Sequence, residues 1–247
     1  QHDGVGLMDR LIGAPPIVRD GRVLNRSVQA MMRVGEMIGV LGDDGPDSVE
    51  VRRAEMRRAA GLGMPTWTGI YVTERRIPGP AGDIPVRIYR RMGRPEAVPA
   101  IVYLHGGGWV VGDLDSHDSS CRLLAHESEC VVVAVDYRLA PEHPFPAAVD
   151  DAVAAYRWVH DHATELSVEP GRVGVMGDSA GGNLAAVVAQ VTRDTDVPPP
   201  TAQCLVYPAT DALFREPSHE LFATGFFLTR ANMEWYRAKY LPDPSDW

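Results

Sequence analysis

Residues 173–182, VGVMGDSAGG, decide the fold of this chain. The apolar run 173–176 is typical of a buried strand, and the residues from Ala180 onward are typical of a helix. Between them, residues 177–181 match G-x-S-x-G, in which a sharp strand-to-helix turn lifts a serine hydroxyl above the sheet edge. The glycines are needed because a β-carbon two residues to either side of Ser179 would collide across the turn. A plain glycine-rich turn with Ser179 as helix N-cap is the alternative.

The segments around this turn predict an α/β fold. Apolar runs at 100–104, 131–135, 173–176 and 202–207 alternate with helical stretches. That alternation predicts a mostly parallel central sheet covered on both faces. Ahead of it, residues 71–77 and 84–90 flank a Pro/Gly-rich turn and predict antiparallel N-terminal strands joined as a hairpin. In the second of these, Val86 and Ile88 alternate with Arg87 and Tyr89, which predicts one face open to solvent.

The two ends of the chain read as helical. Residues 28, 31, 32, 35 and 38 recur at helical spacing and predict an amphipathic helix. Residues 45–48 interrupt it and supply N-cap residues for a second helix through Arg58. Near the other end, Thr229 is the expected N-cap of a helix that runs to Tyr240.

Length and composition restrict the class of protein. The 247 residues suit one α/β domain or at most two small ones. The net charge of −9 disfavours a nucleic-acid partner. No apolar stretch approaches the roughly 18 residues of a membrane span. Cys121, Cys130 and Cys204 form no C-x-x-C pair, which favours free thiols in a reducing, cytoplasmic compartment over a disulfide framework or zinc site. We expect no cofactor and no metal, since no compact His/Asp cluster has ligand spacing.

A second glycine-rich motif, His105-Gly106-Gly107-Gly108-Trp109, directly follows the strand expected at 100–104. Consecutive glycines let backbone N–H groups point into a cavity, where each stabilises an oxyanion by on the order of 3 kcal/mol. Glycine loops after strands also bind nucleotides. Here neither a P-loop Lys-Ser/Thr nor G-x-G-x-x-G spacing accompanies the glycines, and the acidic net charge also disfavours a phosphate.

With these two motifs, the chain resembles the hormone-sensitive-lipase-like branch of the α/β-hydrolases, the bacterial esterases with HGGG and GDSAGG boxes. Residues 136–142, DYRLAPE, form a third matching block. The resemblance runs from about Tyr71 to the end of the chain. It implies an α/β-hydrolase fold with residues 1–65 as a helical cap segment and 66–247 as the hydrolase core.

The resemblance also implies site residues. Ser179 would be the nucleophile, and the N–H groups of Gly107, Gly108 and Ala180 would form the oxyanion hole. His105 would order its own loop rather than act as base, and the block from Asp136 would join a strand to the next helix.

The partners of the serine are harder to place. A serine needs a histidine that accepts its proton and a carboxylate that orients this histidine, and in this fold both follow the serine in the chain. His219 is the one histidine that follows Ser179, and we expect it in an irregular stretch. Asp211 follows the strand expected at 202–207, whereas this fold places its acid after the next strand. We therefore disfavour Asp211 and His219 as the catalytic pair. An unpaired apolar edge at 202–207 would also be costly. We therefore expect the core to be C-terminally incomplete, with the acid and histidine among about 60 further residues.

The predicted function is a carboxylic-ester hydrolase that works through an acyl-enzyme on short- to medium-chain acyl esters. Trp109, Phe226 and Phe227 are candidate substrate-pocket walls, with ordinary core as the alternative. The rival prediction is a non-catalytic, hydrolase-like ligand-binding protein, or a fragment that lacks the acid and histidine of the triad. An amide or lactone hydrolase would share the mechanism. A homodimer is left open, and residues 1–247 alone are expected to be inactive.

Overall fold

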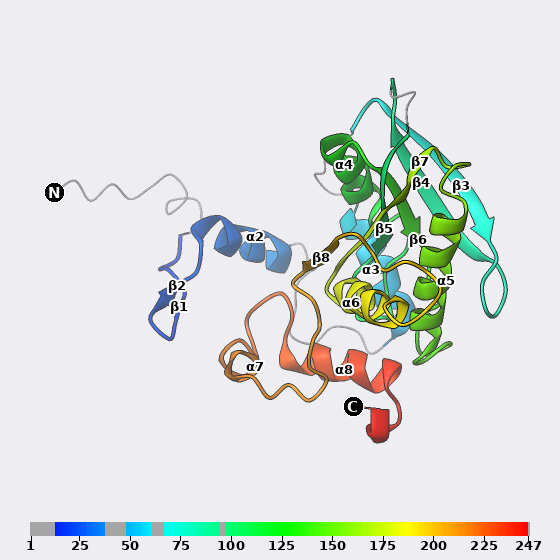
Figure 1. Cartoon of the computed structure of the whole chain (residues 1–247). Helices are drawn as coiled ribbons and strands as arrows, with labels where there is room; N and C mark the ends of the chain where they lie inside the picture. Colours follow the sequence, from blue (N-terminus) through cyan, green and yellow to red (C-terminus); the bar gives the residue numbers. More distant parts are fainter. Residues whose placement is uncertain (1–12, 38–47, 61–66, 94–96, 247) are drawn as a thin grey trace. The chain divides into compact units, whose positions relative to one another are not determined.

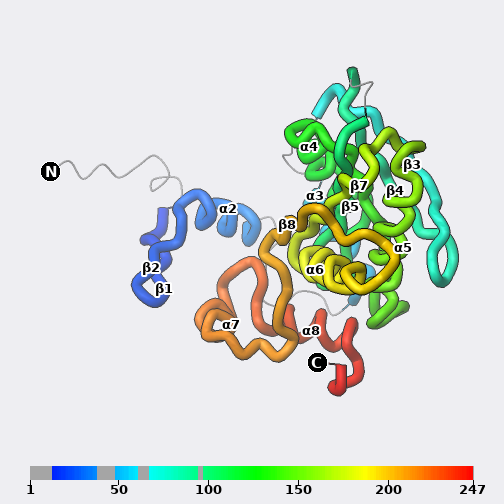
Figure 2. The backbone as a smooth tube through the Cα atoms, in the orientation of Figure 1, coloured from blue at the N-terminus to red at the C-terminus, as the bar shows by residue number. Residues whose placement is uncertain are grey.

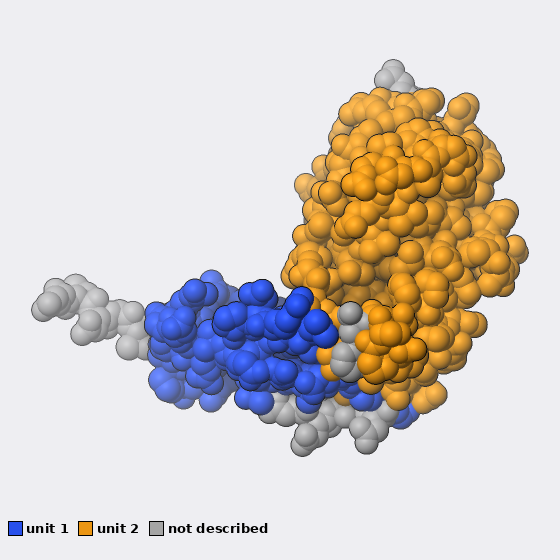
Figure 3. Space-filling model, turned by 60° about the horizontal axis from the view of Figure 1, so that its bottom comes forward, with its two compact units in different colours: residues 1–48, 213–235 blue, residues 49–212, 236–247 orange. Residues whose placement is uncertain are grey.

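The computed structural model describes residues 13–37, 48–60, 67–93 and 97–246. By their contacts, the residues group into two compact units (Figure 3). The first unit comprises residues 1–48 and 213–235, and the second comprises 49–212 and 236–247. The expected boundary between residues 65 and 66 lies outside the described residues, so the division into cap and core stays a prediction.

The second unit contains a six-stranded sheet in the order β3-β4-β6-β5-β7-β8 (Figure 1). The β3–β4 and β4–β6 pairs are antiparallel, and the β5–β6, β5–β7 and β7–β8 pairs are parallel. The predicted α/β fold, with antiparallel strands feeding a parallel series, is therefore confirmed. The strands are β3 (Ile70–Ile77), β4 (Ile84–Arg91), β5 (Val98–Leu104), β6 (Val131–Val135), β7 (Val168–Asp178) and β8 (Gln203–Val206).

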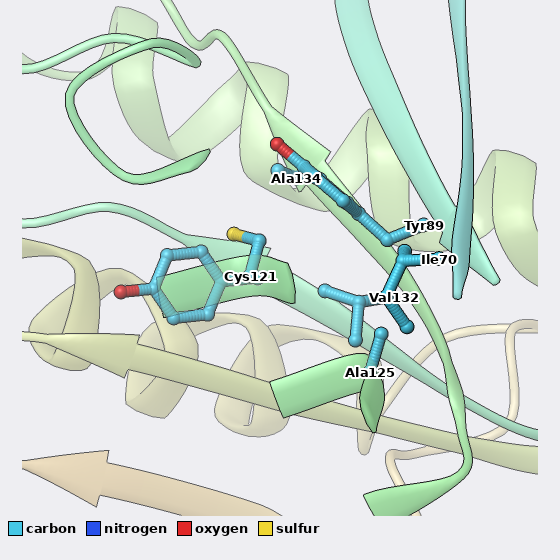
Figure 4. Close-up of a cluster of buried hydrophobic side chains, with 7 residues drawn as sticks. Ile70, Tyr89, Cys121, Ala125, Val132 and Ala134 are labelled. Carbon is cyan, nitrogen blue, oxygen red and sulfur yellow. The ribbon is translucent and has the colours of Figure 1, made fainter. Parts of the chain in front are cut away.

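Helices cover both faces of this sheet. All five residues of β6 are buried, as a strand with two covered faces requires. On one face, Cys121 and Ala125 of α4 pack on Tyr89, Val132 and Ala134 (Figure 4). The helices of this unit are α3 (Val49–Ala60), α4 (Asp118–Ser128), α5 (Ala147–Asp161) and α6 (Ala180–Thr192), joined by the last turns of α8 (Arg230–Tyr240).

The prediction that Tyr89 faces solvent is wrong. Its side chain is fully buried under α4, and its hydroxyl donates a hydrogen bond to Asp118 Oδ1 at 3.0 Å. Arg87 lies on the same face of β4 and is satisfied by Glu74 and Asp115 at the rim. Alternation in β4 indicated one apolar face, but it could not show that a helix covers the other.

The first unit contains α2 (Arg26–Met37), a hairpin of β1 (Val18–Arg19) with β2 (Arg22–Val23), and α7 (Pro217–Leu221). The predicted amphipathic helix is confirmed as α2, in which Met32 and Gly35 are buried but Met31 is 64% exposed. Residue 38 of the predicted stripe lies outside the described residues. The second predicted helix is confirmed as α3, which ends at Ala60.

The chain after β8 runs through α7 into α8 (Figure 2). His219 lies in α7 rather than in the irregular stretch that we predicted, because Pro217 begins a helical turn there. Thr229 caps α8 as predicted, with its Oγ1 accepting a hydrogen bond from the Asn232 N–H at 3.2 Å.

Candidate active site

Ser179 lies in a strained turn between β7 and α6. Its φ of 53° and ψ of −116° are unusual for a residue with a side chain. A β-carbon on Gly177 would come within 2.2 Å of the Gly181 oxygen, and one on Gly181 within 1.9 Å of the Leu104 oxygen. The predicted need for glycine on both sides of Ser179 is confirmed. The Ser179 side chain makes no capping hydrogen bond to α6, which argues against a simple N-cap role.

Hydrogen bonds hold the backbone of Ser179 at both its N–H and its carbonyl. Its N–H donates to the Val206 oxygen at 2.9 Å, and its carbonyl accepts from the N–H groups of Ala209 and Asn183, each at 3.1 Å. The Asn183 side chain adds a 2.9 Å bond to the Ala209 oxygen. Within the described residues, no hydrogen bond to Ser179 Oγ is found. The turn is therefore fixed, and Ser179 as a whole is partly exposed.

The glycine loop leaves the same end of the sheet as Ser179. β5 runs parallel to β7 with Leu104 opposite Gly177, so residues 105–109 and the serine turn follow neighbouring strand ends (Figure 1). Gly107 and Gly108 have φ values of +126° and +59°, which favour glycine. A β-carbon on Gly107 would lie 2.1 Å from the Val111 oxygen, and one on Gly108 would lie 2.4 Å from the Tyr236 ring. No side chain fits at either position.

The orientation of the glycine loop leaves backbone N–H groups without acceptors among the described residues. The Gly107 carbonyl accepts hydrogen bonds from the N–H groups of Val110 and Val111, at 3.1 and 2.9 Å. By contrast, the N–H groups of Gly107, Gly108 and Ala180 donate to no acceptor in the described part of the chain. Such unsatisfied donors at the end of a parallel sheet can stabilise an anion.

His105 holds the beginning of this loop. Its Nδ1 lies 2.8 Å from the Gly106 oxygen, and its ring stacks on Tyr137 with centroids 4.3 Å apart. The Tyr137 hydroxyl donates to the His105 oxygen at 2.7 Å. Burial, and then the neighbouring His117, lower the pKa of His105 to about 4, so its ring is neutral at physiological pH. These contacts agree with the loop-ordering position that the resemblance implied.

The block that begins at Asp136 joins β6 to α5, as expected. Arg138 makes a paired contact with Asp151, whose residue surface is 1% exposed, with both N···O distances at 2.8 Å. Burial, followed by Asp113 and Asp115, raises the pKa of Asp136 to about 6. The block therefore fixes the connection after β6 through an ion pair between the partly exposed Arg138 and the buried Asp151.

Arg53 of α3 makes contacts that the sequence did not predict. Its guanidinium donates to the Val110 oxygen at 2.8 Å, to the Ala140 oxygen at 3.0 Å, and to both carboxylate oxygens of Glu142 at 2.8 Å. It thereby ties α3 to the segment just after the glycine loop. Arg57, one turn further along α3, pairs with Asp113. In the sequence, these contacts are indicated only by the spacing of Arg53 and Arg57, which places both on one side of a helix. That spacing does not show which residues the two arginines contact.

Tyr207 and Asp178 are further residues near the serine that the sequence did not single out. Tyr207 directly follows β8, is 73% exposed and has a φ of +36°, a strained value for a bulky residue. Asp178 directly precedes Ser179 and bonds to Tyr103 and the Gly106 N–H. The pattern G-x-S-x-G leaves the position of Asp178 unspecified, so the motif alone could not reveal this contact.

The candidate pocket residues lie in both units. Trp109 belongs to the second unit and stacks on Tyr240 with centroids 4.4 Å apart. Phe226 and Phe227 belong to the first unit, where Phe226 packs edge-on against Phe222 and Phe227 is 48% exposed. As walls of one substrate pocket, these residues stay a prediction.

The disfavoured pair is also divided, with Asp211 in the second unit and His219 in the first. The His219 ring contacts Phe214 at 5.4 Å between centroids. Its exclusion from the catalytic set stays a prediction.

No group of three or more His, Cys, Asp or Glu side chains among the described residues could hold a metal ion. None of the described helices combines the length and the apolar character that a membrane crossing requires.

Comparisons with known proteins agree on one family. Residues 101–247, more than half of the chain, match a family described as alpha/beta hydrolase fold. The chain is 45% identical over 232 residues to the carboxylic ester hydrolase LipN of Mycobacterium tuberculosis, covering 92% of this chain and 61% of LipN. It is also 45% identical over 198 residues to the carboxylesterase NlhH of the same organism, covering 79% of this chain and 61% of NlhH. The chain thus spans about three fifths of the length of these curated relatives.

Solved structures give the same result. An ester-hydrolase from the metagenome of Lake Arreo, EH1AB1, superposes with a TM-score of 0.82 at 39% identity, covering 89% of this chain and 71% of that one. A thermostable esterase from Pseudomonas putida superposes with a TM-score of 0.84 at 34% identity, covering 95% of this chain and 71% of the esterase. These likenesses support the predicted hormone-sensitive-lipase-like branch. The chain belongs to the α/β-hydrolase fold family.

Proposed function

We propose that the protein is a carboxylic-ester hydrolase that forms an acyl-enzyme on Ser179. The observation that carries this proposal is the strained turn, which fixes the backbone of Ser179. Among the residues that the structure describes, neither its hydroxyl nor the N–H groups of Gly107, Gly108 and Ala180 have a hydrogen-bond partner. The names of the relatives, carboxylic ester hydrolase and carboxylesterase, support the same chemistry.

In the proposed reaction, Ser179 Oγ attacks the carbonyl carbon of the ester and the carbonyl oxygen becomes an oxyanion. The N–H groups of Gly107, Gly108 and Ala180 are the proposed donors to this oxyanion. Ala180 is also the first residue of α6, so the positive end of the helix dipole favours the same charge. The intermediate collapses to an acyl-serine and an alcohol, and water then releases the acid.

The reaction needs a base for the Ser179 proton. No histidine among the described residues makes a hydrogen bond to Ser179 Oγ. We propose that a histidine and its orienting carboxylate come later in the full-length gene product, in the order Ser, acid, His that this fold uses.

The proposed substrates are small-molecule esters with short- to medium-chain acyl groups. Trp109, Phe226 and Phe227 remain the proposed apolar walls for the acyl chain. A cytoplasmic location belongs to the same proposal. It is supported by Cys121, Cys130 and Cys204, whose thiols are free, as a reducing compartment allows.

Turnover of p-nitrophenyl acetate and butyrate by the full-length gene product tests the proposal. The Ser179→Ala variant should lose about 10⁴-fold or more in kcat, because no other group replaces the nucleophile. Ser218→Ala, an exposed serine of α7, is the matched control and should keep full activity. Equal turnover by wild type and Ser179→Ala would favour the rival function, a non-catalytic ligand-binding protein.

A further inference from the structure

The carboxylate of Asp178 joins the two motifs of the candidate active site. Asp178 is the last residue of β7 and directly precedes Ser179. Its Oδ1 accepts a hydrogen bond from the Gly106 N–H at 3.0 Å and another from the Tyr103 hydroxyl at 2.7 Å. Both donors come from β5 and the loop after it. One oxygen atom therefore connects the strand that carries the serine to the strand that carries the glycine loop.

The loop backbone lies directly on this carboxylate. A β-carbon on Gly106 would come within 2.2 Å of Asp178 Oδ2 and 3.0 Å of the Asp178 carbonyl oxygen. A side chain at 106 would displace the Asp178 carboxylate from its present position. The first glycine of the motif is therefore explained by Asp178, whereas Gly107 and Gly108 are explained by Val111 and Tyr236.

The second oxygen of the carboxylate faces a buried histidine. Asp178 Oδ2 lies 3.8 Å from Nε2 of His117, which is 9% exposed and precedes α4. Nδ1 of His117 lies 3.0 Å from Ser116 Oγ. Burial by itself would raise the pKa of Asp178, but His117, Tyr103 and the Gly106 N–H more than offset it, and the pKa lies below its ordinary value. The carboxyl is thus ionised at neutral pH.

The other contacts of the loop fix its peptide planes one by one. The Gly106 carbonyl faces His105 Nδ1, and the Gly107 carbonyl accepts from Val110 and Val111. Because a trans peptide directs its N–H opposite to its C=O, these bonds also fix the directions of the Gly107 and Gly108 N–H groups. The peptide between His105 and Gly106 is held by Tyr137 at its carbonyl and by Asp178 at its N–H. Asp178 is the one of these partners that belongs to the serine strand.

We propose that Asp178 is a positioning residue of the reaction, holding the glycine loop in register with Ser179 so that the oxyanion donors are aligned before the substrate binds. This inference rests on the proposed ester hydrolysis. Misaligned donors weaken the transition state more than the bound substrate, so loss of Asp178 lowers kcat and leaves KM nearly unchanged.

Three variants of the full-length gene product test the assignment. Asp178→Ala removes both hydrogen bonds, and we expect kcat to fall about 10²-fold, the loss typical of a disturbed oxyanion donor. Asp178→Asn keeps an acceptor for the Gly106 N–H but loses the charge, and its kcat should fall less than that of Asp178→Ala. Tyr103→Phe leaves the Gly106 contact in place and should change kcat least. Asp196→Asn, an exposed carboxylate paired with Arg157, is the matched control and should keep wild-type kcat.

A trifluoromethyl ketone with a butyl-sized chain provides a readout that a general loss of structure would not give. Its adduct with Ser179 places an oxyanion in the glycine loop. In Asp178→Ala, its inhibition constant should therefore rise by about the same factor as kcat/KM falls, while KM for p-nitrophenyl butyrate stays within about threefold of wild type. Circular dichroism and the melting temperature verify that each variant is folded.

The outcomes separate this inference from the proposed function. Turnover that survives in Ser179→Ala refutes the hydrolase mechanism itself. If Ser179→Ala is inactive but both Asp178 variants keep wild-type kcat and ketone affinity, only the positioning role is refuted. If KM rises while kcat stays at the wild-type value, the positioning role is refuted as well. If Asp178→Ala does not fold, Asp178→Asn decides by the same criteria. If neither Asp178 variant folds, Asp178 is assigned to folding and the proposal is overturned.

Discussion

At the scale of single residues, the turn around Ser179 leaves no space for a β-carbon at Gly177 or Gly181. Gly177 and Gly181 face each other across it, and Gly181 also touches the end of β5. This part of the site could be predicted from the sequence, because the steric requirement is local to five residues. Asp178 could not be predicted, because its role depends on Gly106 and Tyr103, more than 70 residues away in the chain.

Gly181→Ala and Gly182→Ala form a matched pair within α6. A β-carbon at 181 would lie 1.9 Å from the Leu104 oxygen, whereas one at 182 would lie no closer than 3.1 Å to any atom. Alanine favours a helix over glycine by about 1 kcal/mol, which helps both variants equally. We expect Gly181→Ala to lose at least about 2 kcal/mol of stability and Gly182→Ala to stay within about 1 kcal/mol of wild type. Urea unfolding measures both, and equal midpoints would contradict this packing.

His105 gives a pH prediction at the same scale. Its folded-state pKa of about 4 lies below the value of 6.5 for a free histidine, mainly because the ring is buried. Between these two values the unfolded chain binds the extra proton, so this residue costs stability as the pH falls from 6.5 towards 4. The imidazole NMR signals of His105 should report a neutral ring at pH 5.5. A protonated ring at that pH would show that the site is more open than described.

At the scale of elements, most strands and helices follow from hydrophobic periodicity. The hairpin β3–β4, strands β5, β6 and β8, and helices α2, α3 and α8 begin and end within a few residues of the predicted bounds. The strand predicted at 173–176 is confirmed as part of β7, which already begins at Val168. What periodicity missed depends on tertiary partners. Tyr89 is buried because α4 covers it, and Arg53 of α3 bonds to the Val110 oxygen, a partner that no local pattern specifies.

Removing Arg53 should loosen α3. Arg53→Met loses the bonds to the Val110 and Ala140 oxygens and to Glu142, and we expect a loss of about 1–2 kcal/mol in the free energy of unfolding. The hydrogen bond from Arg53 lowers the pKa of Glu142 to about 2, below its ordinary 4.5. This part of the stability is therefore present above pH 4.5 and disappears as the pH falls towards 2.

The difference in stability between wild type and Arg53→Met should accordingly narrow between pH 6 and pH 3, as measured by urea unfolding at each pH. Arg193→Met is the control, since Arg193 pairs with Asp194 at an exposed surface site and should change stability by less than about 0.5 kcal/mol. A difference that is constant over this pH range would show that the Glu142 pair contributes nothing.

At the scale of the whole molecule, the chain presents the serine turn and glycine loop on one sheet, and it covers 61% of its relative LipN. The family could be predicted from two motifs, because each requires a particular backbone. The grouping of residues 1–48 with 213–235 could not, since no local pattern links segments that far apart.

A polypeptide limited to residues 1–247 should hydrolyse p-nitrophenyl butyrate at least about 10³-fold more slowly than the full-length gene product, since no described histidine bonds to Ser179. The two proteins are compared at equal concentration, with Ser179→Ala of each as the blank. Equal turnover would mean that a histidine within residues 1–247, such as His219, acts as the base.

The central claim is that Ser179 is the nucleophile, and a fluorophosphonate tests it most directly. The full-length gene product is incubated with the probe, digested, and sequenced by tandem mass spectrometry. We predict one phosphonyl group per chain, attached to Ser179, with hydrolysis lost in proportion to labelling. Labelling of a different serine, or full hydrolysis after Ser179 is labelled, would contradict the account.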